Sequence, residues 1–312
     1  RTMATEQIEA TEIALETWEE DTRGPSDFSL AMRDLSRRPP AMFGLLCVVF
    51  VIVWALVPQL FAPMDPYLQN LDLTLKPPGY VNSDGFTYWA GTDQLGRDLL
   101  SRIIWGSRIS LIVGFVAVLL SGAIGITLGL VAGFYGGIVD TVISRIIDIA
   151  LSVPFILLAM SIIAILGTSL QNVILAMAVR TWIVYARPIR GAVLSAKEYE
   201  YIVGARANGC RTPRILIRHL LPNVLSTAIV IATLYLGRMI IIEASLSFLG
   251  VGVPPPTPAW GGMLADGRSY LDTAWWIAVF PGLALMLIVL GINLFGDWIR
   301  DALDPRMKRL AD

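Results

Sequence analysis

The stretch Ile109-Ser-Leu-Ile-Val-Gly-Phe-Val-Ala-Val-Leu-Leu-Ser-Gly-Ala-Ile-Gly-Ile-Thr-Leu-Gly-Leu-Val-Ala-Gly-Phe-Tyr-Gly-Gly-Ile-Val139 contains no charged residue. A helix needs about 20 apolar residues to cross the hydrocarbon core of a membrane. This stretch is long enough to do so, and it predicts a membrane-spanning helix over 109–133.

Further charge-free runs begin at Met42, Ile149, Leu220 and Thr273. The run from Ile149 is divided by Gly167-Thr-Ser-Leu-Gln-Asn172, so it predicts two spans instead of one. The predicted fold is therefore all-α, a polytopic membrane protein with six transmembrane helices. The six predicted spans are 42–62, 109–133, 149–166, 171–187, 222–243 and 275–296.

The composition supports this fold class. Hydrophobic residues make up 55% of the 312 residues and charged residues 16%, against about 25% charged residues in soluble domains. Such a chain is not an ordinary cytosolic enzyme, a disordered chain or a disulfide scaffold. The net charge of −1 gives no sign of nucleic-acid binding. The single histidine, His219, excludes a multi-histidine metal site, so we expect no metal and no cofactor bound by this chain.

Lysine and arginine are concentrated on one side of the predicted spans, in the segments 33–38, 187–218 and 300–309. Because basic residues mark the cytoplasmic side, both termini are predicted to be cytoplasmic. The chain then divides into an acidic cytoplasmic N-terminal segment, an interfacial elbow helix and a six-span domain. These are 1–27, 28–41 and 42–312, and the last contains an outer loop with an interfacial helix (63–108), a cytoplasmic loop (188–221) and an outer loop (244–274).

The cytoplasmic loop contains a short helix, a break and a second helix. Gly209 ends the first helix as a C-terminal glycine. Thr212 is the expected N-cap of the second helix, with Pro213 at its first position and Pro222 at the membrane boundary. Small residues keep the first helix thin enough to enter a groove on another protein. These small residues are Gly204, Ala205 and Ala207.

This loop resembles the EAA loop of ABC importer permeases. Ala205, Gly209, Leu221 and Pro222 match that pattern at the right spacing, whereas Val203, Gly204 and His219 depart from it. The chain from about 30 to 309 is similar to the dipeptide/oligopeptide/nickel branch of these permeases. Four further stretches support the resemblance: Gly91-Thr-Asp-Gln-Leu-Gly-Arg-Asp98, Glu243-Ala-Ser-Leu-Ser-Phe-Leu-Gly250, Pro255-Pro-Thr-Pro-Ala-Trp-Gly261 and Gly296-Asp-Trp-Ile-Arg-Asp-Ala-Leu-Asp-Pro305.

The resemblance implies a type I ABC importer permease fold in the cytoplasmic membrane of a bacterium or archaeon. The chain would form half of a pathway beside a second homologous permease subunit. Two ATPase subunits would bind ATP and Mg, and an extracytoplasmic substrate-binding protein would deliver the substrate. The residues expected to couple the ATPase to the spans are Glu200, Tyr201, Gly204, Ala205, Arg206, Ala207, Gly209, Arg211 and Pro222. The alternative is a basic loop that holds topology and binds membrane lipid.

A charged residue inside a membrane span raises the free energy of the folded protein unless it is paired with an opposite charge or hydrated. Arg180, Arg238 and Glu243, together with Ser245, are expected to line the pathway or to meet the partner permease. The alternative is a snorkelling arginine and an acid at the outer interface. Arg145 and Asp148 have the spacing of a helix ion pair. The glycines at 125, 129 and 133 predict a flat strip for close helix approach.

Two other function classes compete with the importer permease. A secondary transporter or channel would need coupling carboxylates in the membrane, and Glu243 is the only candidate. An enzyme is disfavoured because the sequence has no P-loop, zinc-protease or nucleophile-elbow motif. Peptides are the first choice of substrate, and nickel chelates, opines and glutathione are the alternatives. The N-terminal segment is expected to be a solvated tail, or else a helix that contacts an ATPase or the membrane.

Overall fold

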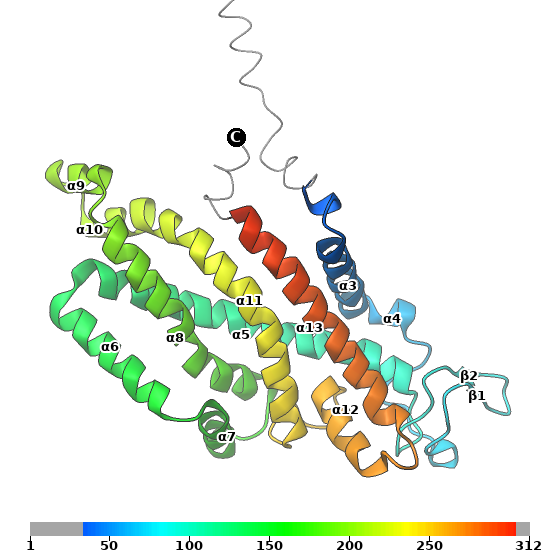
Figure 1. Cartoon of the computed structure of the whole chain (residues 1–312). Helices are drawn as coiled ribbons and strands as arrows, with labels where there is room; N and C mark the ends of the chain where they lie inside the picture. Colours follow the sequence, from blue (N-terminus) through cyan, green and yellow to red (C-terminus); the bar gives the residue numbers. More distant parts are fainter. Residues whose placement is uncertain (1–33, 304–312) are drawn as a thin grey trace, which may run out of the picture.

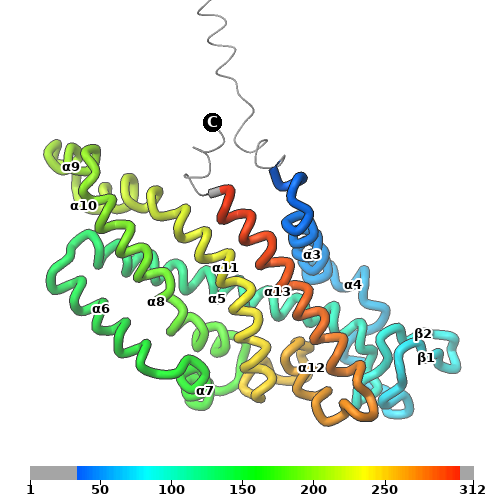
Figure 2. Tube along the Cα trace, in the orientation of Figure 1, coloured from blue at the N-terminus to red at the C-terminus, as the bar shows by residue number. Residues whose placement is uncertain are grey.

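The computed structural model describes residues 34–303 (Figures 1 and 2). The predicted segment 1–27 and the first part of the elbow helix lie outside these residues. Helices make up nearly all of the regular structure. In order they are α3 (Pro39–Leu56), α4 (Pro58–Phe61), α5 (Leu99–Tyr135), α6 (Gly137–Ser152), α7 (Phe155–Leu166), α8 (Leu170–Ala196), α9 (Glu200–Ala207), α10 (Thr212–Arg214), a π-helix (Ile215–Leu220), α11 (Leu221–Phe248), α12 (Trp260–Gly267) and α13 (Trp276–Leu303), with 3₁₀ turns at Leu71–Leu73 and Arg268–Tyr270.

Four of the described helices are long and apolar enough to cross a membrane, namely α3, α5, the helix from Thr212 to Phe248, and α13. The pair α6 and α7 meets the same criterion jointly, although the two are bent by 91°. The described residues therefore support four spans, or five with the bent pair. The predicted count of six also includes α8, which does not meet the criterion and carries Arg180, Arg187 and Arg190.

The second predicted span is longer than expected at its N-terminus. The separate interfacial helix predicted within 63–108 is wrong, because α5 runs unbroken from Leu99 to Tyr135. Its first turn is fixed by Asp98, whose side chain accepts a hydrogen bond from the backbone N–H of Ser101 at 2.8 Å. The apolar face of this first part, including Leu99 and Ile103, packs in the protein core instead of lying on a membrane surface.

The third predicted span, 149–166, is also not a single helix. Pro154 stands at the break between α6 and α7, and its ring removes the N–H that a continuous helix would need. The predicted ion pair between Arg145 and Asp148 is absent from the described residues. Asp148 instead pairs with Arg187 of α8 at 2.7 Å.

The glycine strip on α5 packs against α8, as the spacing predicts. A Cβ atom added at Gly125 would lie 2.2 Å from the carbonyl oxygen of Trp182, and one at Gly129 would lie 2.8 Å from that of Ala186. No side chain fits in this space, so glycine is required for the two backbones to approach.

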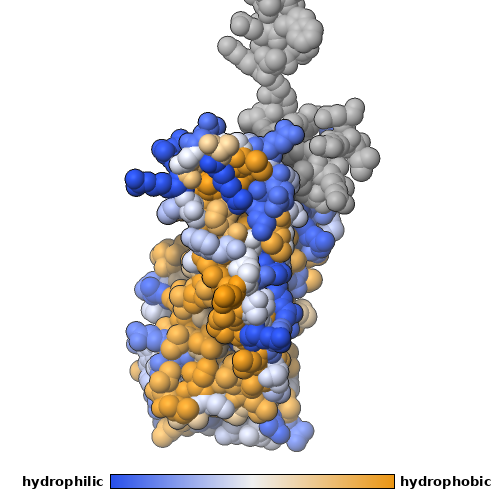
Figure 3. All heavy atoms as spheres, turned by 90° about the vertical axis from the view of Figure 1, so that its left-hand side faces the viewer, coloured by the Kyte–Doolittle hydropathy of each residue, from blue (hydrophilic) through white to orange (hydrophobic). Residues whose placement is uncertain are grey.

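The two ends of the bundle differ. At one end lie α9, the start of α3 and the end of α13, and at the other lie α12 and the short hairpin of β1 (Tyr80–Val81) and β2 (Thr87–Tyr88) (Figure 1). The face seen in Figure 3 is apolar over its middle and lower part, whereas hydrophilic residues gather at its upper end. This is the distribution expected of helices in lipid with one polar end in water.

Candidate coupling site and charges within the helices

The short helix α9 is anchored by one side chain. Ile202 is fully buried, and it packs in a cluster that joins α9 to three long helices. The same cluster contains Leu130 of α5, Ile189 and Val193 of α8, and Val224 of α11. A force on α9 therefore reaches three helices of the bundle through one apolar contact region.

Gly209 ends α9 as predicted. Its φ of +74° lies in the left-handed region that glycine adopts without strain. The N–H of Gly209 donates to the carbonyl of Arg206 at 2.9 Å, and the N–H of Cys210 donates to that of Ala205 at 3.0 Å. These two bonds form a Schellman motif. The next helix begins at Thr212, so Arg211 occupies the cap position and the prediction of Thr212 as the N-cap is wrong by one residue.

The outer surface of α9 is open. Tyr201 and Val203 are about half exposed, and Glu200, Arg206 and Ala207 are exposed. A Cβ atom at Gly204 would meet nothing within 4 Å, so the packing of the described residues does not explain the small residue at this position.

Two polar contacts hold α9 in place. The Nδ2 of Asn223, at the start of α11, donates to the hydroxyl of Tyr201. The guanidinium of Arg206 lies over the ring of Phe134, at the end of α5.

Pro222 lies inside a continuous helical run and not at a break. The run from Thr212 to Phe248 passes through α10, the π-helix and α11. Pro222 lacks an N–H, and the wider π turn directly before it leaves room for its ring. The loop that holds Arg211 is thus connected directly to a spanning helix.

Glu243 lies inside the packed helices. It has no exposed surface, and it accepts hydrogen bonds from the hydroxyls of Ser247 at 2.7 Å and Ser110 at 3.3 Å. Ser245 is partly exposed, and its hydroxyl donates to the carbonyl of Ile241. The structure therefore separates two residues that the sequence analysis grouped together.

Arg180 and Arg238 both lack an acidic partner within residues 34–303. The Nε of Arg180 is buried and makes no hydrogen bond there. Arg238 is exposed, and its Nη1 lies 3.4 Å from the hydroxyl of Tyr235.

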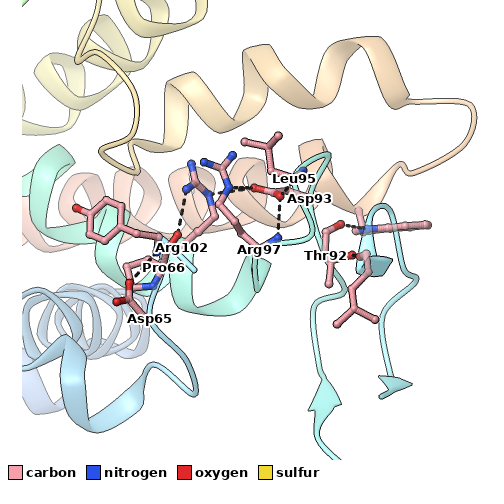
Figure 4. A network of polar contacts seen from close by, with 10 residues as sticks. Asp65, Pro66, Thr92, Asp93, Leu95, Arg97 and Arg102 are labelled. Atoms are coloured by element: carbon pink, nitrogen blue, oxygen red, sulfur yellow. Dashed lines mark hydrogen bonds and ion pairs between the residues drawn. The ribbon is translucent and has the colours of Figure 1, made fainter. Parts of the chain in front are cut away.

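A polar network at the start of α5 was not predicted from the sequence (Figure 4). Asp93 accepts from the Nε of Arg97 at 2.6 Å, and the Nε of Arg102 lies 3.4 Å away. Arg102 also donates to the carbonyl of Pro66 at 3.2 Å. All three charged residues are more than nine-tenths buried, so the network fixes the outer loop to α5. Residues 93–97 form a turn and not a helix, so the i, i+4 spacing that pairs charges on a helix gave no guide to this contact.

Between this network and α12 lies a pocket of about 270 Å³, lined by Arg97, Arg102, Asp266 and the loop around Pro254. The described residues contain no group of three or more His, Cys, Asp or Glu side chains that could hold a metal ion.

Two families of transport proteins match the sequence of this chain. The family described as binding-protein-dependent transport system inner membrane component matches residues 125–309. The N-terminal TM domain of oligopeptide transport permease C matches residues 26–78. The chain belongs to the family of binding-protein-dependent transport system inner membrane components. It is a permease subunit of an ABC importer, and ATP hydrolysis belongs to partner subunits.

Particular relatives cover most of the chain. The dipeptide transport system permease protein DppC of Alkalihalophilus pseudofirmus is 43% identical and aligns over 89% of this chain and 90% of its own length. The di/tripeptide transport system permease protein DppC of Pseudomonas aeruginosa is 42% identical, over 92% and 95%. The glutathione transport system permease protein GsiD of Escherichia coli is 43% identical, over 88% and 89%.

A solved structure has the same fold. It is an inward-facing conformation of the MetNI methionine ABC transporter, with a TM-score of 0.52 at 24% sequence identity. The match covers 66% of this chain and 98% of that chain.

Proposed function

We propose that this chain imports short peptides, chiefly dipeptides and tripeptides, as one of two permease subunits in an ATP-driven importer. The observation that carries this proposal is the similarity to dipeptide and di/tripeptide permeases over about nine-tenths of the chain. The similarity to glutathione permeases supports a second candidate, glutathione, which is itself a tripeptide.

The complex would contain a second homologous permease, two ATPase subunits that bind ATP and Mg, and an extracytoplasmic binding protein. Both chain termini and α9 would lie in the cytoplasm. The exposed face of α9 would bind the ATPase, and the cluster around Ile202 would carry the movement of the ATPase to α5, α8 and α11. Glu200, Tyr201, Arg206 and Arg211 would supply polar contacts, and Gly204 would let the ATPase surface approach.

The test is uptake of labelled dialanine, trialanine and glutathione by cells that lack their own peptide and glutathione permeases. The cells carry this chain together with the other subunits from its own operon. The proposal expects uptake of dialanine and trialanine that stops when the ATPase subunits are inactivated. A matched culture receives a nickel chelate instead. Uptake of nickel but of no peptide would contradict the proposed substrate class, and uptake without any ATPase would contradict the importer mechanism.

A further inference from the structure

Arg180 and Arg238 lie at the same depth in the bundle. Thr181, which follows Arg180 in α8, has its hydroxyl 3.7 Å from the sulfur of Met239, which follows Arg238 in α11. Each arginine is therefore one residue, or about 1.5 Å of helix rise, from a pair of side chains in contact.

Both arginines also face the same side of the bundle. Trp182 of α8 contacts the glycine strip of α5, and Arg180 stands two residues before it, which is about 200° around the helix. Ile240 of α11 packs against Gly114 of α5, and Arg238 again stands two residues before it. The two arginines thus lie on the side of α8 and α11 that faces away from α5, which runs behind both helices in Figure 1.

No carboxylate of the described residues neutralises this pair. Asp140 and Asp148 are paired with Arg190 and Arg187, and Glu243 is buried against two serines. An unpaired arginine near the centre of a membrane costs about 2.5 kcal/mol or more. Two of them at one depth, with no acidic partner among residues 34–303, form a positively charged pair to which an anion from outside the chain can bind.

Arg238 and its neighbour Tyr235 can both donate hydrogen bonds to an acceptor. Tyr235 accepts from Arg238 at 3.4 Å, which leaves its phenol proton free to donate. The guanidinium of Arg238 also lies over the Tyr235 ring, 5.4 Å from the centroid, and this contact restricts its orientation. Guanidinium groups bind a carboxylate through two parallel hydrogen bonds, which gives direction as well as charge recognition.

We propose that Arg180 and Arg238, with Tyr235, bind the C-terminal carboxylate of the peptide as it passes through the membrane. This inference rests on the proposed import of peptides. Peptides of different sequence share this one anionic group. A site for the carboxylate accepts many side chains and still holds every substrate in one direction.

The experiment measures the maximal uptake rate of dialanine and of dialanine amide, in proteoliposomes that hold the complete transporter and receive saturating binding protein. The variants are Arg180→Gln, Arg238→Gln and Arg238→Lys. Arg108→Gln is the matched control, because Arg108, like Arg238, is an exposed arginine of a long helix and has no acidic partner among the described residues. Co-purification of the second permease and of the ATPases is measured for each variant.

The proposal expects each glutamine variant to lower dialanine uptake about tenfold or more, the effect of losing a charge-assisted hydrogen bond. Arg238→Lys restores part of the rate, Arg108→Gln behaves like the wild type, and every complex remains assembled. The amide, which lacks the negative charge, is carried at the same rate by the wild type and the glutamine variants.

Three results would overturn the site. Unchanged dialanine uptake in both glutamine variants would show that no carboxylate is bound there. Loss of the second permease on purification would assign the arginines to an ion pair between subunits. An equal fall in the uptake of dialanine and its amide would show a role that does not involve the carboxylate. If the chain does not import peptides at all, the result is different, because the wild-type transporter would then carry neither dialanine nor dialanine amide.

Discussion

The guanidinium of Arg206, in α9, lies 4.8 Å from the centroid of the Phe134 ring, at the end of α5. This contact joins the short helix α9 to the 37-residue helix α5. It lies at the surface, where a cation–π contact contributes about 0.5–1 kcal/mol. Its main effect is therefore on the orientation of α9 rather than on overall stability.

We predict that Phe134→Leu loosens α9 without unfolding the bundle. The ring that receives the guanidinium is lost, whereas the apolar volume is largely kept. ATP hydrolysis per peptide imported should rise by a factor of a few, because α9 then follows the ATPase less closely. Purified transporter in proteoliposomes gives both rates. Phe134→Tyr, which retains the ring, is the control, and equal ratios in the two variants would contradict this role.

Gly204 and Gly209 offer a second test within the same helix. Gly204→Val adds a side chain into open space, so the thermal stability of the isolated chain should not change by more than about 0.5 kcal/mol. Binding of the ATPase and peptide uptake should both be lost if the partner occupies that space. Co-purification with the ATPase measures the first, and full retention of binding would place the docking surface elsewhere.

Gly209→Val acts through the backbone instead. A φ of +74° costs a residue with a side chain about 1–2 kcal/mol, so the Schellman motif opens and α9 frays at its end. The chain should still insert, while ATP hydrolysis becomes uncoupled from peptide uptake. Gly209→Asn, which tolerates this backbone conformation better, should recover part of the coupling. Full coupling in Gly209→Val would contradict the role of this turn.

Gly125→Val should destabilise the bundle itself. The new Cβ would stand 2.2 Å from a carbonyl oxygen of α8, so the two helices must separate. The added side chain removes a close packing contact along the strip, and we expect a loss of about 1–3 kcal/mol. Thermal unfolding in detergent measures it. Gly191→Ala, at an open position of α8, is the control and should unfold near the wild-type temperature.

The burial of Asp98 predicts that the stability of the folded chain depends on pH. Burial raises the pKa of this carboxyl above its usual range, although hydrogen bonds from Ser101 oppose the shift. A folded-state pKa above the unfolded value favours the folded protein at low pH, and this contribution is lost as the pH rises through the folded-state pKa. Asp98→Asn keeps an N-cap and cannot ionise. Its unfolding temperature should exceed that of the wild type at pH 7, and the difference should shrink towards pH 4.

A constant difference across that range would show that Asp98 does not titrate with folding. Asp98→Ala provides the comparison without any cap. Relative to Asp98→Asn it should lose about 1 kcal/mol of stability at every pH, because neither variant ionises at this position.

Local patterns in the sequence predicted the features that depend on neighbouring residues. The apolar runs predicted the long helices. The glycines at i, i+4 spacing predicted the close approach of α5 to another helix, and Gly209 predicted the end of α9. The family resemblance added the transport class, which the composition alone left open between an importer permease and a secondary carrier.

Features that depend on distant partners were not predictable in this way. Asp148 has Arg145 at helix spacing, but Arg187 on α8 lies closer in space. The start of α5 was placed too late because charged residues near Arg102 resembled a membrane-surface helix, whereas they are buried against Asp93 and Pro66. The burial of Glu243 likewise depends on Ser110, which is 133 residues away in the chain.

The uninterrupted run from Thr212 to Phe248 has 37 residues, so its length is about 55 Å. It is therefore almost twice as long as the hydrocarbon core of a bilayer is thick. One end follows α9 in the chain, and the other ends beside the pocket lined by Arg97, Arg102 and Gly250. Between its two ends, Ile240 of this run packs against Gly114 of α5. A rigid helix of this length, held at that contact, would turn a tilt at its α9 end into an opposite displacement at its other end, without any change within the helix.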